Sequence, residues 1–115
     1  MNKVLPLLII SIITTGFTVA ADDKCPYKNL TVSSISEALK MKNNTNVVIE
    51  GNIDKKLSDD KYTFKDNTGS IIAEIDKEAW GVINSNTKEK IKLLGEIEQE
   101  NNTTIIDVDK VKQIK

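Results

Sequence analysis

Two pairs of carboxylates are the residues of this chain best placed to do chemistry. Glu74 and Asp76 are two residues apart, and so are Asp107 and Asp109. This spacing puts both members of a pair on one face of a β-strand. Paired carboxylates serve in glycoside hydrolysis and bind hard cations. On a solvated strand they are more often solubilising charge, so we expect at most weak cation binding and leave a hydrolase built on Glu74 and Asp76 as the last alternative.

The residue types that most enzymatic and metal chemistry needs are missing from the chain. It has no histidine, and Cys25 is its one thiol. These counts exclude Ser-His and Cys-His nucleophile pairs, a cysteine zinc site and an internal disulfide. In an oxidising compartment Cys25 could still join two chains. We therefore predict no enzyme, no cofactor and no built metal site.

A third group of candidates surrounds two aromatic residues. Tyr62 and Phe64 alternate with Lys61, Thr63 and Lys65. Small barrels that bind single-stranded nucleic acid stack the bases on outward aromatic rings above a basic groove. If these rings faced solvent, the alternate polar residues would lie in the core at a high desolvation cost. We expect the rings to point inward, and at a net charge of −1 with no arginine we expect no nucleic-acid partner.

The remaining candidate is Trp80, which lies outside any clear strand. A tryptophan at such a place serves either as an anchor in a ligand pocket or as a plug for one end of a barrel; the plug is favoured. The ligand-binding candidates are therefore Lys61, Thr63, Lys65, Glu74, Asp76 and Trp80.

Five short segments with strand-like alternation must position these residues. Two of them share the pattern apolar-x-apolar-x-Gly-x-Ile, with Gly51 and Gly95 inside the strand. A glycine there marks a strongly coiled strand or a close backbone approach. Five strands of which two are bent predict a mainly β fold, a five-stranded Greek-key barrel of the OB type. The predicted strands are Val47–Ile53, Lys61–Asp66, Ser70–Asp76, Lys90–Glu98 and Thr104–Ile114.

Helices and turns complete the predicted domain. Ser34 and Glu37 have the spacing of a capping box, which predicts a short helix over Ile35–Lys42. A hairpin is expected at Asp66–Gly69, because Asn and Gly tolerate a positive φ. Glu100–Asn102 supplies another turn, and the connector Lys77–Lys88 has room for one helical turn.

The first twenty residues are typical of an export signal. Lys3 precedes an apolar run, Val4–Ile13, and small residues end at Ala20 and Ala21. The run is too short to span a bilayer of about 30 Å stably. We predict a signal peptide over 1–20, cleaved after Ala20 or alternatively after Ala21, a flexible lead-in over 21–32 and an OB-fold domain over 33–115. The expected location is the periplasm, without stable membrane insertion after cleavage, and a retained anchor is the alternative.

A set of motifs runs along the chain in a fixed order: Val47–Ile53, Asp60–Asp66, Thr68–Gly69, Ala73–Asp76, Trp80, Leu94–Ile97 and Ile106–Asp109. This ordered set resembles the bacterial OB-fold (BOF) family, also called the YgiW/YdeI stress-tolerance family. The resemblance covers about residues 33–115, and Cys25 in the lead-in departs from the family pattern. It implies a signal peptide, a leading helix, a five-stranded barrel and a periplasmic role in stress tolerance, but it brings no catalytic residue or ligand.

Two non-enzymatic functions follow from these observations. The first is a periplasmic binding protein that contributes to envelope stress tolerance by binding a small ligand or a cation. The alternative is an interaction module that docks an envelope or outer-membrane protein through the outer face of the barrel. The sequence alone leaves open the ligand, the oligomeric state, the relevant stress and the state of Cys25.

Overall fold

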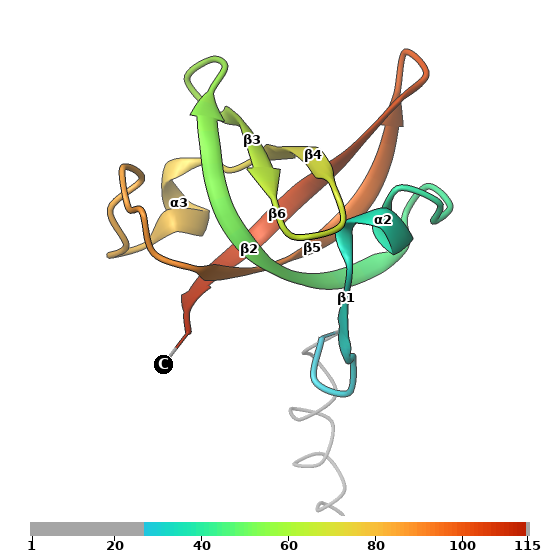
Figure 1. Cartoon of the computed structure of the whole chain (residues 1–115), viewed down its shortest axis with the longest axis horizontal. Coiled ribbons are helices and arrows are strands. Elements are labelled where there is room, and N and C mark those ends of the chain that lie inside the picture. The colour runs from blue at the N-terminus through green and yellow to red at the C-terminus, as the bar shows by residue number, and fades with distance from the viewer. Residues whose placement is uncertain (1–26, 115) are drawn as a thin grey trace, which may run out of the picture.

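The structure is a computed structural model that describes residues 27–114 (Figure 1). The predicted signal peptide, its cleavage site and Cys25 lie outside these residues. No helix among the described residues is long and apolar enough to cross a membrane. The elements are β1 (Val32–Ser33), α2 (Ile35–Ala38), β2 (Asn46–Lys56), β3 (Lys61–Lys65), β4 (Ser70–Glu74), α3 (Lys77–Trp80), β5 (Ile91–Glu100) and β6 (Thr103–Gln113).

Five of the strands close into a ring. Their order is β2-β3-β4-β6-β5, and β5 pairs back onto β2. The β4–β6 pairing is parallel, and the other pairings within the ring are antiparallel. This confirms the predicted five-stranded OB-type barrel. The short strand β1, which pairs in parallel with β2 outside the ring, was not predicted because two residues carry no periodicity.

The two strand glycines lie where the barrel backbone is most crowded. A Cβ atom on Gly51 would lie 2.2 Å from the carbonyl oxygen of Lys65, and one on Gly95 would lie 2.2 Å from that of Asp107. At Gly51, β2 ends its pairing with β5, and from Asn52 it pairs with β3. The predicted close approach of the backbone is confirmed at both glycines, and it allows long strands to bend into a closed ring.

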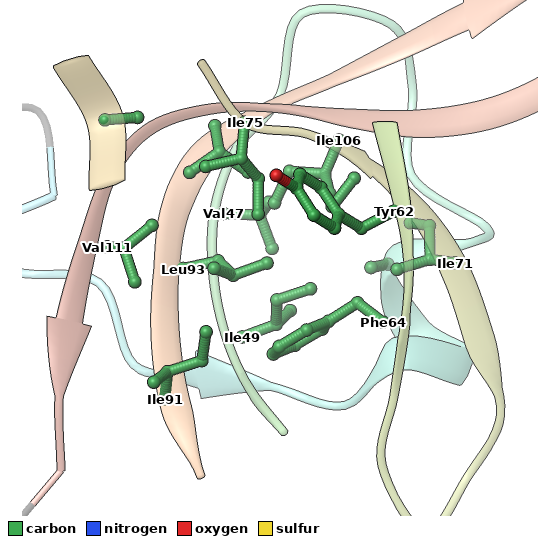
Figure 2. Close-up of a cluster of buried hydrophobic side chains, with 14 of the residues drawn as sticks. Val47, Ile49, Tyr62, Phe64, Ile71, Ile75, Ile91, Leu93, Ile106 and Val111 are labelled. Carbon is green, nitrogen blue, oxygen red and sulfur yellow. The ribbon is translucent and has the colours of Figure 1, made fainter. Parts of the chain in front are cut away.

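The inner face of the ring forms the hydrophobic core (Figure 2). Phe64 and Tyr62 point from β3 towards aliphatic side chains of β2 and β5, among them Ile49 and Leu93. Phe64 is 0% exposed and Tyr62 is 3% exposed. The prediction that both rings point inward is therefore confirmed. Trp80 packs at the edge of this core, with its ring in a T-shaped contact with Tyr62 at 5.5 Å between centroids.

The helix α2 is shorter than predicted. Its capping box is present: Ser34 Oγ accepts the N–H of Glu37, and Glu37 Oε1 accepts the N–H of Ser34. The prediction of helix as far as Lys42 was wrong, since α2 ends at Ala38. The amides of Lys40 and Met41 donate three residues back rather than four, so the chain tightens into a turn before β2.

The β3–β4 turn lies where the sequence predicts it, but a different interaction shapes it. Neither Asn67 nor Gly69 has a positive φ. Instead, one carboxylate oxygen of Asp66 accepts the amides of Thr68 and Gly69, and the other accepts the amide of Ile35 at the start of α2. One aspartate thus shapes the turn and attaches the helix to the barrel.

The remaining strand ends differ only slightly from the prediction. β2 runs on to Lys56, whereas β4 ends at Glu74 and not at Asp76. The β5–β6 turn forms as predicted, with Asn101 and Asn102 both at positive φ between the paired residues Glu100 and Thr103. The predicted single helical turn in the connector is α3.

Candidate functional site

Three carboxylates lie side by side across the outer face of the barrel. Glu74 on β4 pairs in register with Asp107 on β6, and Asp107 pairs with Glu96 on β5. Their side chains point outward, because the core residues Ala73, Ile106 and Ile97 occupy the alternate positions. We call Glu74, Asp107 and Glu96 the acidic row. Like charges directly opposite on neighbouring strands are destabilising, so the barrel gains nothing from this arrangement by itself.

Burial and mutual repulsion raise the pKa values of two acids of this row, Glu74 and Asp107, and of Glu98 beside it. Partial burial and then the charge of Asp107 raise the pKa of Glu74, although Lys61 opposes the rise. Burial and the charge of Asp109 raise the pKa of Asp107. Burial and the charge of Asp107 also raise the pKa of Glu98. A nearby positive charge would oppose all three shifts.

The lysines and threonine predicted on β3 do face outward, but other groups already engage them. Lys61 lies opposite Glu74 and is the cation nearest the acidic row in the register of the sheet. Thr63 Oγ1 accepts the amide of Lys55 where the β2–β3 register shifts. Lys65 Nζ lies 3.5 Å from Asp54 Oδ1. Lys61 is therefore the member of this group that borders the acids.

The structure separates the other two candidates from the site. Asp76 follows β4 as the N-cap of α3, where its Oδ1 accepts the amide of Ala79 at 2.9 Å. It does not share a strand face with Glu74 as the spacing predicted, although its charge still raises the pKa of Asp107. Trp80 is 6% exposed and belongs to the core. It is positioned as the barrel plug rather than as a surface anchor, and its buried Nε1 has no hydrogen-bond partner within residues 27–114.

Sequence reasoning missed two of the residues that gather here. Glu96 and Glu98 alternate outward on β5, but their significance depends on the β5–β6 register, which a strand pattern does not reveal. Asp109 was recognised as a partner of Asp107. It accepts a hydrogen bond from the hydroxyl of Tyr27, and burial together with this carboxylate raises the pKa of Tyr27.

The site is an open surface and not an enclosed cleft. Within residues 27–114, no group of three or more His, Cys, Asp or Glu side chains is arranged to hold a metal ion. A shallow depression of about 400 Å³ lies between β1 and the β3–β4 turn, and another of about 340 Å³ lies over Thr63 and Ile72. Neither is lined by the acidic row. Spread-out negative charge of this kind fits a ligand with several separated positive charges better than a single chelated ion.

Comparisons with known proteins agree with the fold. The family described as bacterial OB fold (BOF) protein matches residues 15–113. The chain is 35% identical over 111 residues to the "Calcium-regulated OB-fold protein CarO" of Pseudomonas aeruginosa, covering 96% of each chain. It is 31% identical over 86 residues to Protein YgiW of Escherichia coli (strain K12), covering 75% of this chain but only 66% of that protein. The solved structure of ygiW from E. coli superposes with a TM-score of 0.69 at 31% identity, covering 73% of this chain and 90% of that chain.

Proposed function

The chain belongs to the bacterial OB-fold (BOF) family, and we propose that it is a non-enzymatic binding protein whose acidic row takes a cationic ligand. We further propose that it is exported to the periplasm and contributes there to envelope stress tolerance. Export is supported by the basic start, the apolar run Val4–Ile13 and the small residues that end at Ala20 and Ala21.

The observation that carries the ligand proposal is the direct opposition of Glu74, Asp107 and Glu96 across three strands. This repulsion is offset in register by one cation, Lys61. A bound polycation would supply the missing positive charge and would favour the ionised form of each acid. Because the charges are spread over the sheet and not gathered around a point, an extended cation such as a polyamine is the best fit. Calcium belongs in the test because one relative is described as calcium-regulated.

A non-enzymatic role is supported by the chemistry of the site. The chain has no histidine to act as a base at neutral pH. Glu74 and Asp76, the pair considered for a hydrolase, do not form a pair on one strand, because Asp76 caps α3. The acidic row is also open to water, whereas catalysis by carboxylates needs a site that positions and desolvates a substrate.

The test is a thermal-unfolding series of the full chain with spermidine, calcium chloride and a neutral sugar at constant ionic strength. A ligand at a hundred times its Kd adds about 2.7 kcal/mol to the free energy of unfolding. We expect the melting temperature to rise most with spermidine, less with calcium and not with the sugar. The double variant Glu74→Gln/Asp107→Asn should lose most of the spermidine effect.

Glu89→Gln is the matched control, because it removes one exposed carboxylate outside the acidic row. It should respond to spermidine as the wild type does. If wild type, double variant and control all shift equally, the effect is nonspecific and the proposed site is wrong. No response to any cation would contradict the proposed function itself.

A further inference from the structure

A second surface of the barrel combines exposed aliphatic side chains with lysines. Val32, Val48, Leu94 and Lys110 occupy consecutive register positions across β1, β2, β5 and β6. Val48, Leu94 and Lys110 point outward, since their neighbours Val47, Leu93 and Val111 lie in the core. A continuous row thus crosses four strands, apolar for three positions and cationic at the fourth.

The apolar part of this surface has a buried floor and exposed side chains above it. Val48 is 5% exposed and Leu94 is 7% exposed even though both face away from the core. They form the floor of a shallow groove of about 360 Å³, which Leu30 and Val32 also line. Leu30 is 41% exposed and Val32 is 45% exposed. Two aliphatic side chains therefore lie over an apolar floor with much of their own surface in water.

Lysines border the same groove. Lys92 and Lys112 lie directly opposite each other on β5 and β6, and Lys28 lines the groove from the lead-in. Within residues 27–114, the only carboxylate within 4 Å of any of these lysines or of Lys110 is Glu50, whose Oε2 lies 3.7 Å from Lys92 Nζ. Opposed cations on neighbouring strands are unfavourable, and here no neighbouring acid offsets Lys112. We call this surface the lysine face: Lys28, Leu30, Val32, Lys92, Lys110 and Lys112.

We propose that the lysine face is a peripheral docking surface for an anionic lipid bilayer. Lysines attract a negatively charged headgroup layer, while the exposed aliphatic side chains between them enter its apolar boundary. Lysine stems cover apolar surface while their ammonium groups stay at the headgroups. Two exposed aliphatic side chains are too few for insertion, so the binding is reversible and depends on salt.

The kind of cation on this surface favours a bilayer over an acidic protein as the occupant. Docking of acidic proteins often uses the bidentate fork of arginine, and this chain has none. Lysine ammonium groups act as point charges, which suits a layer of mobile anionic headgroups. Leu30 and Val32 line the same groove as Lys28, Lys92 and Lys112 with much of their surface in water, so they would meet the apolar boundary of the bilayer when the lysines meet its headgroups.

The test is co-sedimentation of the full chain with vesicles. One set of vesicles is anionic and contains phosphatidylglycerol and phosphatidylcholine in equal parts. The other set is neutral and contains phosphatidylcholine alone. We expect tighter binding to the anionic vesicles than to the neutral ones, and we expect 0.5 M salt to reduce this difference. Lys110→Gln/Lys112→Gln should reduce the affinity roughly 10- to 30-fold. Leu30→Ser/Val32→Ser should reduce the affinity that remains at 0.5 M salt, because the attraction between lysines and headgroups is screened there and the apolar contact contributes most of the binding.

Matched controls come from other parts of the barrel surface. Lys40→Gln/Lys42→Gln removes two exposed lysines, and Val82→Ser removes an aliphatic side chain that is fully exposed, both outside the lysine face. These variants keep residues 1–26, so any binding by that segment is common to all samples. Each variant is used only if its unfolding temperature matches that of the wild type.

The inference is overturned if the lysine-face variants bind anionic vesicles as tightly as the controls do. It is also overturned if no protein binds the vesicles while an acidic peptide such as polyglutamate binds the wild type and not the Lys110→Gln/Lys112→Gln variant. That second result would assign the face to a protein partner. Neither outcome depends on spermidine, so failure here is separable from failure of the acidic row.

Discussion

The two halves of the β5–β6 pair carry opposite charge on the same outward face. On one side of Gly95 the outward residues are acids, Glu96 and Glu98 with Asp107 opposite. On the other side they are Lys92 and Leu94, with Lys112 and Lys110 opposite. The net charge of −1 conceals this separation. In both halves like charges face each other across the strands, so these pairings cost stability. Both proposed binding surfaces lie where this cost occurs.

The inner face of the same two strands shows the contrast. There the side chains are aliphatic, tightly packed and nearly inaccessible, as Leu93, Ile106 and Val111 illustrate (Figure 2). If stability alone decided the outer face, opposite charges would be expected to alternate across it, as Lys61 and Glu74 do. The difference teaches that the packed inner face stabilises the barrel, while the charges on its outer face are not needed for folding.

The largest expected effect on stability comes from substituting Gly95, which lies between the acidic half and the lysine half of the β5–β6 pair. Gly95→Ala places a Cβ atom 2.2 Å from the carbonyl oxygen of Asp107, where β6 carries its register shift. Because backbone must move to make room, we expect the free energy of unfolding to fall by about 2–3 kcal/mol. Urea unfolding followed by the fluorescence of Trp80, the single tryptophan, measures it.

Gly69→Ala is the control for that experiment. Its added Cβ would meet nothing closer than a side-chain atom of Ile35 at 3.9 Å, and its φ is not positive. We expect a change of less than about 0.5 kcal/mol. An equal loss of unfolding free energy in Gly95→Ala and Gly69→Ala would mean that the close backbone approach at Gly95 is not important for the stability of the barrel.

A smaller effect is expected from relieving the repulsion in the acidic half. At pH 7, Asp107→Asn should raise the free energy of unfolding by about 0.5–1 kcal/mol, because it removes one of three opposed carboxylates. The pKa values of Glu74, Glu98 and Asp107 are raised in the folded protein, so the folded state binds more protons than the unfolded state just above the ordinary carboxyl pKa. The repulsion therefore grows as pH rises through the raised pKa values.

The advantage of Asp107→Asn should accordingly be full at pH 7 and vanish near pH 3, as chemical unfolding at several pH values would show. Lys112→Gln is the comparison in the lysine half. It removes a like-charge neighbour of Lys92, but ammonium groups in general stay charged between pH 3 and 7. Its effect should stay constant over this range. An Asp107→Asn effect that is equally independent of pH would refute the mutual repulsion of the acids.

The sequence predicts the inner face of this protein far better than the outer one. Alternation fixes which residues of a strand face the core, so the inward Tyr62 and Phe64 and the two crowded glycines followed from local patterns. The acidic row did not follow, because Glu74, Asp107 and Glu96 come together only through a parallel and an antiparallel register. Asp76 was misplaced for a related reason. Continued alternation implied a strand where the carboxylate in fact caps α3.

The central claim is that the acidic row binds a cation, and the pKa values of Glu74 and Asp107 in the row and of Glu98 beside it test this most directly. NMR of the side-chain carboxyl carbons would follow the titration of Glu74, Glu98 and Asp107 in the full chain, with and without saturating spermidine. We predict that all three pKa values lie above their ordinary values in the free protein and fall when spermidine is added, while the lowered pKa of Asp66, in the β3–β4 turn outside the acidic row, does not change. Titration curves that are unaffected by spermidine, or that shift equally at Asp66, would contradict the claim.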